Sequence, residues 1–168
     1  MELEERGLRV ISVMEEIPEL SHLPLDALKN IPLGRLRKGS TQRHGVCRWN
    51  KGAAIDINDI KAINIHPDAL NERWSRYADK VLYHEFLHAL GFYNHDDEFY
   101  RMEELWPDAE AFGMKREFSD FLMDKYCKWE LACPSCELRG LRSRRPKGRY
   151  FCKKCKSVMD CLERELPR

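Results

Sequence analysis

Three histidines and a glutamate lie close together in the stretch YHEFLHALGFYNHDD, at positions 83–97. On an α-helix, residues four apart are separated by about 40° around the axis, so His84 and His88 point the same way. Two imidazoles at this spacing can occupy two corners of a tetrahedral zinc site. Glu85 lies beside His84, where its carboxylate can reach a water on the metal. The pattern is the H-E-x-x-H arrangement of zinc hydrolases.

The residues that follow predict a third ligand. Gly91 is a usual helix stop, because glycine takes a left-handed conformation without a Cβ clash, and the turn lets His95 swing beneath the helix. Four acids are alternative third ligands, of which the first three are more simply explained as acids favoured at a helix N-terminus: Asp96, Asp97, Glu98 and Glu103. In the competing interpretation, His84 and His88 only hydrogen-bond inside a core.

The chemistry expected of this set is hydrolysis of a peptide bond. Three protein ligands with one open position are typical of a catalytic zinc, which lowers the pKa of its bound water and polarises a carbonyl. Glu85 would take the proton of that water and pass it to the leaving amine. Tyr93 and Tyr100 could donate to the developing oxyanion, although packing is the favoured interpretation of both.

Seven cysteines point to a second zinc site. Four of them form two C-x2-C knuckles separated by fifteen residues, a spacing that closes a tetrahedron of thiolates: Cys133, Cys136, Cys152 and Cys155. A closed thiolate shell has no position for substrate, so this zinc is expected to be structural. Cys47 could approach the active site but is better interpreted as a small buried hydrophobe. Cys127 and Cys161 are left outside the ligand set.

A basic loop separates the two knuckles. Nine basic residues and no acid occur between Leu138 and Lys156, on a chain whose net charge is only +1, so the rest of the chain is acidic. Basic side chains neutralise phosphates and aromatic rings stack on bases, which predicts non-specific binding of nucleic acid. The expected contacts are Arg142, Arg144, Arg145, Lys147, Arg149 and Tyr150. The alternative is a solvated loop that keeps the ribbon soluble.

The elements that must position these residues predict an α+β fold. Turn residues separate three short segments at 34–41, 44–52 and 61–67, which suggest a small antiparallel sheet. Helical patterns cover about 68–90, 97–105 and 115–129, and the first is apolar around nearly its whole circumference, as in a central helix. The predicted domains are residues 1–130 and 131–168. No apolar run is long enough for a membrane span and the first residues are acidic, so we expect a cytosolic protein.

The pattern HEFLHALGFYNHDDEFY, preceded by HGVCRW and IDINDIKAINIHPDAL and followed by the four-cysteine ribbon, resembles the SprT-like metalloproteases, relatives of the Spartan DNA–protein crosslink protease. The resemblance covers residues 34–160. It implies a zincin-like domain with a C-terminal zinc ribbon, with His84, His88 and His95 as zinc ligands and Glu85 as the catalytic acid/base. The chain departs from the metzincin pattern by one extra residue before His95. It is also similar to the WLM group, in which an NH pair and an aromatic-containing helix follow H-E-x-x-H.

The resemblance therefore implies a zinc endopeptidase with one catalytic and one structural zinc. Its expected substrates are proteins bound or crosslinked to DNA, and the DNA is expected to be single-stranded or bound without sequence preference. We expect a monomer that does not contact membranes, in the cytoplasm or on the nucleoid of a prokaryote. The alternatives are a non-proteolytic, transcription-associated nucleic-acid-binding module with a vestigial zinc site, a WLM-type peptidase, or a hydrolase of small amides.

Overall fold

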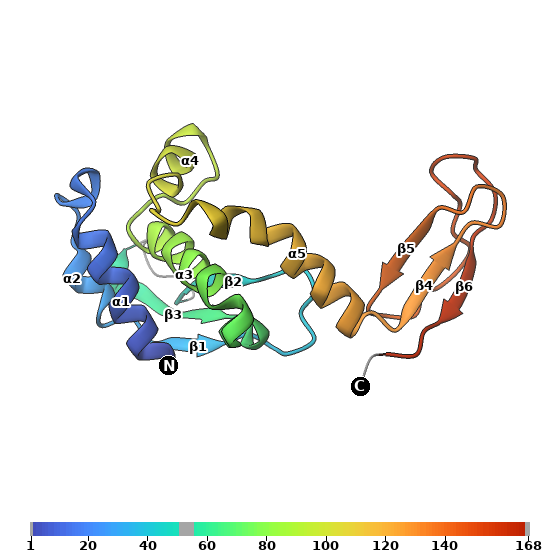
Figure 1. Cartoon of the computed structure of the whole chain (residues 1–168), viewed down its shortest axis with the longest axis horizontal. Coiled ribbons are helices and arrows are strands. Elements are labelled where there is room, and N and C mark those ends of the chain that lie inside the picture. The colour runs from blue at the N-terminus through green and yellow to red at the C-terminus, as the bar shows by residue number, and fades with distance from the viewer. Residues whose placement is uncertain (1, 51–55, 167–168) are drawn as a thin grey trace. The chain divides into compact units, whose positions relative to one another are not determined.

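The chain folds into helices and short strands, which the computed structural model describes over residues 2–50 and 56–166 (Figure 1). The helices are α1 (Leu3–Glu15), α2 (Leu25–Leu28), α3 (Ser75–Ala89), α4 (Asp97–Glu103) and α5 (Ala109–Tyr126), with 3-10 turns at Pro18–Leu20, Ile57–Asp59, Pro67–Leu70 and Glu72–Trp74. The strands are β1 (Leu33–Arg35), β2 (Gly45–Trp49), β3 (Ile60–Ile65), β4 (Trp129–Ala132), β5 (Arg139–Arg142) and β6 (Asp160–Glu163). The fold is mixed α+β, as the sequence predicted.

The described chain divides into two compact units. The first comprises the residues up to 38 together with 43–115, and the second comprises 39–42 together with the residues from 116 onward. Helix α5 contributes residues to both units. The functional boundary expected between residues 130 and 131 stays a prediction.

The sheet of the first unit has the strand order β1-β3-β2. Strand β2 pairs antiparallel with β3, with Cys47 opposite Ile63, whereas β1 pairs parallel with β3, with Leu33 opposite Ile63. The prediction of a wholly antiparallel sheet was therefore wrong for β1. Strand composition does not encode direction, and the connection from β1 to β2 crosses to the other edge of β3. The predicted end of the second segment, at residues 51 and 52, lies outside the described residues.

Helix α3 is the centre of the first unit. Eleven of its fifteen residues are buried, so the apolar circumference in the sequence does mark a central helix. It packs on β2 and β3 on one side and on α1 on another (Figure 1). It begins at Ser75 rather than near residue 68, because Asn71 has extended backbone angles that interrupt the helical path after Pro67.

An ion pair ties α1 to the first turns of α3. Arg6, itself buried, donates from Nη1 to the Asp79 carboxylate at 2.5 Å and to the carbonyl of Ser75 at 2.7 Å. A buried charge is costly unless it is paired in this way. The apolar side of α1, with Val10 and Met14 fully buried, packs beside this pair. Helix α3 therefore has a fixed position before it reaches the histidines near its end.

Two acids start the helices that follow α3. The Asp96 side chain accepts from the amide of Phe99 at 3.0 Å and caps α4, as expected of an acid at this place. The Asp108 side chain accepts from the amide of Ala111 at 3.3 Å, which starts α5 at Ala109, earlier than the predicted residue 115. Helix α5 also ends earlier than predicted, at Tyr126. Trp129 belongs to strand β4.

The second unit contains a sheet of order β5-β4-β6 in which both pairings are antiparallel. Glu130 lies opposite Leu141 on one side and Leu162 on the other. The sequence predicted a zinc ribbon here but did not predict the third strand, β6. Among the described residues, no helix is both long and apolar enough to span a bilayer.

Candidate metal centres

Three imidazoles converge at the end of α3. The Nε2 atom of His84 lies 3.2 Å from Nε2 of His88 and 3.2 Å from Nε2 of His95. A tetrahedral zinc with ligands at 2.0–2.1 Å requires nitrogens about 3.3–3.4 Å apart, so the observed spacing nearly matches the edge of such a site. The three histidines predicted from the sequence could therefore hold a metal ion.

The other ring nitrogens show which atoms face the centre. Nδ1 of His88 donates to the carbonyl of Phe92 at 2.7 Å, and Nδ1 of His84 donates to the Glu103 carboxylate at 2.6 Å, since neither oxygen partner has a proton to give. Burial lowers the pKa of both imidazoles, which favours the neutral rings. Each Nε2 then carries a lone pair, and lone pairs 3.2 Å apart repel unless a cation lies between them.

The cap at the end of α3 positions the Phe92 carbonyl and His95. The amide of Phe92 bonds to the carbonyl of Leu87 at 3.2 Å and that of Gly91 to His88 at 3.1 Å, which is a Schellman motif. Gly91 has φ +109, a value that side chains with a Cβ rarely adopt. This cap turns the Phe92 carbonyl toward the His88 ring and sends the chain back toward His95. The turn predicted at Gly91 is confirmed.

Glu85 is held between α3 and the edge strand β2. It is 5% exposed, and the backbone amide of Cys47 hydrogen-bonds its carboxylate. A Cβ at Gly45 would lie 2.6 Å from Oε1 of Glu85 and 2.7 Å from Cγ1 of Val81, so only glycine lets the strand come this close. Burial raises the pKa of Glu85 to about 7, despite the opposing effect of the Cys47 amide. A carboxylate with this pKa is suited to general-base work near neutral pH.

The Cys47 thiol takes no part in this arrangement. Its side chain is buried, and burial together with the nearby charge of Glu85 raises its pKa to about 12. A thiol that stays protonated is a poor nucleophile and a poor metal ligand. Its burial agrees with the interpretation of Cys47 as a small hydrophobe.

The two tyrosines considered as oxyanion donors each contact another aromatic ring. Tyr93 meets the ring of Trp49 edge to face at 5.9 Å, and Tyr100 stacks beside His95 at 6.3 Å. Both are partly exposed. These contacts agree with packing, the favoured interpretation.

The four acids considered as third ligands lie outside the histidine group. Asp96 caps α4, and Asp97 and Glu98 lie in its first turn. Glu103 lies behind the His84 ring, where its carboxylate accepts the hydrogen bond from His84 Nδ1. Sequence reasoning missed this role, and it also missed Lys80 and Phe99. The available signal was the four-residue spacing of Phe99 and Glu103, which places both on one side of α4.

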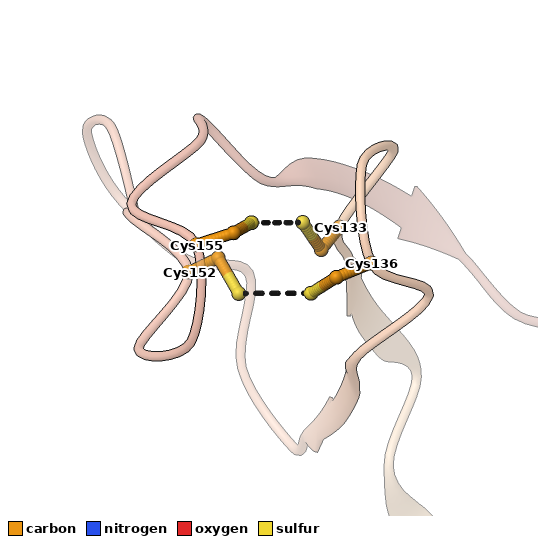
Figure 2. A group of neighbouring side chains, drawn as sticks. All are labelled: Cys133, Cys136, Cys152 and Cys155. Carbon is orange, nitrogen blue, oxygen red and sulfur yellow. Dashed lines mark hydrogen bonds between the residues drawn. The ribbon is translucent and has the colours of Figure 1, made fainter.

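The four knuckle cysteines form the second centre, shown in Figure 2. Sγ of Cys133 lies 3.4 Å from Sγ of Cys155, and Sγ of Cys136 lies 3.4 Å from Sγ of Cys152. Thiolates at 2.3 Å from a tetrahedral zinc would be about 3.8 Å apart, so a small spreading of the side chains accommodates the ion. Hydrogen bonds with Ser157 lower the pKa of Cys155 to about 6, which favours the thiolate form. Cys127 and Cys161 are outside the group, as predicted.

The two knuckles have the same backbone geometry. The amide of Cys133 bonds to the carbonyl of Leu138 at 2.9 Å, and that of Cys152 bonds to Ser157 at 2.8 Å. The residue after each second cysteine takes a positive φ, +59 at Glu137 and +64 at Lys156. Neither is glycine, so each position stores strain. The matching turns present two sulfurs each toward a common point.

Relieving this strain should stabilise the ribbon. Glu137→Gly is expected to raise the free energy of local opening at the first knuckle by about 1 kcal/mol, because glycine adopts this φ without the Cβ clash. Lys153→Gly is the matched control, since Lys153 lies in the second knuckle without a positive φ and should become less stable. Amide hydrogen exchange on the zinc-loaded chain measures both. Equal effects of the two changes would show that the knuckle turn stores no strain.

The basic loop presents the residues predicted to contact nucleic acid. All six are exposed: Arg142, Arg144, Arg145, Lys147, Arg149 and Tyr150. The Arg145 guanidinium lies 5.1 Å from the ring centroid of Trp129, on the neighbouring strand β4. Phe151, 59% exposed, pairs across a β-bridge with exposed Val158. It follows Tyr150 directly in the chain, so two exposed aromatic residues are consecutive. The ribbon thus combines exposed cations with exposed rings.

Comparisons of the chain with protein-family models, with curated proteins and with solved structures found no match.

Proposed function

We propose that the protein is a zinc-dependent endopeptidase with a zincin-like catalytic domain of SprT-like type. The observation that carries the proposal is the convergence of three Nε2 lone pairs beside a buried carboxylate, that of Glu85. A structural site closes its shell with four protein ligands, whereas this group offers three. The resemblance of the H-E-x-x-H segment to SprT-like proteases supports the same conclusion.

Zinc is the ion that fits both donor sets best. Three imidazoles at tetrahedral spacing and four thiolates are each typical of zinc, while magnesium and calcium prefer oxygen ligands. The histidine centre would hold the catalytic ion and the cysteine centre the structural one. When bound at the histidines, zinc supplies a water of lowered pKa and polarises a carbonyl.

The chain's own residues account for the proton transfers. Glu85 takes the proton of the attacking water and later gives it to the leaving amine. Its carboxylate is oriented by the Cys47 amide on β2, so it does not need to reorganise during the reaction. Its burial and a pKa of about 7 let it serve as base and then as acid at neutral pH.

The ribbon is proposed to bring the protease to proteins held on DNA. Its exposed arginines and lysines can neutralise phosphates, and Tyr150 with Phe151 can stack on unpaired bases. Contacts of this kind do not read base edges, so they favour single strands without sequence preference. The proposed substrate is therefore defined by its location on DNA rather than by its sequence.

The test is a cleavage assay on a protein crosslinked to single-stranded DNA, with the same protein free in solution as the comparison. The zinc-loaded chain should cleave the crosslinked protein faster, and added salt should remove the difference. A variant with Arg144, Arg145 and Lys147 changed to Ala should cleave both at the slower rate. Cleavage of neither substrate, with DNA still bound, would overturn the protease proposal in favour of a nucleic-acid-binding module. Equal cleavage by native chain and variant would overturn the role of the ribbon.

A further inference from the structure

Helix α4 presents one side to the histidine centre. Phe99 and Glu103 are four residues apart and lie along one side of the helix, while His95 directly precedes the N-cap residue Asp96. Phe99 is fully buried, and its ring centroid lies 4.9 Å from His84, 4.8 Å from His88 and 4.8 Å from His95. A buried ring that touches all three imidazoles limits their rotation. The orientation of each ring is thus set by packing, which leaves the position of the protons to be fixed.

The last residue of α4, Glu103, forms a buried ion pair with Lys80 of α3. The Lys80 ammonium bonds to Oε1 of Glu103, the oxygen that also accepts from His84 Nδ1 at 2.6 Å. The side chains of Lys80 and Glu103 are 9% and 12% exposed. Lys80 precedes His84 by one turn of α3, and its ammonium also lies over the ring of Phe112 at 4.8 Å. Two long charged side chains are thus largely removed from water, which is costly unless they are paired with each other.

The pairing makes Oε1 of Glu103 an acceptor. The Lys80 ammonium has only protons to donate, so this oxygen accepts from Lys80 and is oriented to accept from His84 Nδ1 as well. A carboxylate can only accept hydrogen bonds, so it requires the proton of His84 to be on Nδ1. In a histidine without such a partner, either ring nitrogen can carry the proton, and a proton on Nε2 would block the metal.

We propose that Lys80 and Glu103 are positioning residues for the metal: together they lock His84 in the Nδ1–H tautomer, so that Nε2 is free before the ion arrives. This inference rests on the proposed zinc site but not on peptide cleavage. The backbone carbonyl of Phe92 does the same for His88 without any side chain. His84 therefore depends on a side-chain pair that single substitutions can remove, while His88 provides an internal reference.

The tautomers can be observed directly by long-range ¹H–¹⁵N NMR of the imidazoles in the metal-free chain. The native chain should show His84 and His88 both as Nδ1–H. Glu103→Ala should move the His84 proton at least partly to Nε2 and leave His88 unchanged, which also reports that the fold is intact. Glu103→Gln, which keeps an accepting oxygen, should restore most of the native signal. An unchanged His84 tautomer in Glu103→Ala would overturn the proposal.

Zinc affinity gives the second readout, measured by titrating zinc against a competing chelator. The histidine site is identified as the one that is lost in His95→Ala. Glu103→Ala and Lys80→Met should each lower the zinc affinity of that site by about 10- to 100-fold and leave the affinity of the cysteine site unchanged. The controls remove a charge from the same helices. Arg76→Met on α3 breaks an exposed pair with Asp108, and Glu98→Ala alters the exposed first turn of α4. If the two controls lowered the zinc affinity as much as Glu103→Ala and Lys80→Met do, the effect would be one of charge in general. That result would overturn the assignment of Lys80 and Glu103 as positioning residues. Loss of cleavage with normal tautomers would instead count against the protease alone.

Discussion

Replacing Glu85 by glutamine is expected to slow peptide cleavage by about 10²- to 10⁴-fold while both zinc ions stay bound. The amide has nearly the same shape and can still accept from the Cys47 amide, so the geometry between α3 and β2 is kept. Without a basic oxygen it cannot take a proton from water. The measurement is single-turnover cleavage of the DNA-linked substrate, together with the zinc content of the same sample.

The same substitution should not reduce stability. Burial raises the pKa of Glu85 to about 7, so ionising it inside the fold is unfavourable compared with the unfolded chain. The raised pKa means that the folded state binds more protons than the unfolded state between the unfolded value of about 4.3 and pH 7. This group therefore makes the protein less stable as the pH rises through that window. Glutamine removes the charge, and we expect equal or higher thermal stability at pH 8.

Two outcomes bear on this prediction. Glu98→Gln, on the exposed first turn of α4, is the matched control and should cleave normally with normal stability. Unchanged cleavage by Glu85→Gln would show that another group takes the proton and would sink the mechanism. A Glu85→Gln chain that has lost zinc would assign the residue to the metal shell instead.

The sequence could predict the centre because its main spacings are local. His84 and His88 are one helical turn apart, and Gly91 ends the helix by a cap that acts through the backbone. Both follow from the geometry of one element and need no knowledge of the tertiary fold. The cysteine knuckles are equally local, since each is a single turn. Joining the two knuckles required only the chemistry of zinc.

The remaining parts depend on how separate elements meet. Glu103 is nineteen residues from His84 along the chain, and their contact exists only because α4 packs on α3. Lys80 is a charged residue whose burial the sequence does not indicate, and it is buried where its ammonium meets that same carboxylate and the ring of Phe112. The parallel direction of β1 likewise follows from a crossover rather than from strand composition. Periodicity identifies faces of elements but not the partners of those faces.

Replacing one knuckle cysteine is expected to release one of two zinc ions and to unfold the ribbon. Among the described residues after α5, the buried apolar side chains are Cys127, Leu131, Cys133 and Cys152. Two of these four are ligands, so the ribbon has too little core to fold without metal. Structural zinc typically provides about 10–16 kcal/mol of apparent binding free energy, far more than such a core can replace. Cys136→Ser should therefore expose β4, β5 and β6 to hydrogen exchange.

Loss of zinc from one centre should not affect the other. Variants of the two centres therefore distinguish the proposed catalytic role of the histidine site from the proposed DNA-binding role of the ribbon. Cys136→Ser should hold one zinc, cleave the free protein substrate at the native rate and lose the preference for the DNA-linked one. His88→Ala should also hold one zinc, but with the ribbon protected from exchange, DNA bound and no cleavage. Cys161→Ser, an exposed cysteine outside the group, should behave as the native chain. Two zinc ions in Cys136→Ser would refute the four-cysteine centre, and loss of both ions in either variant would refute their independence.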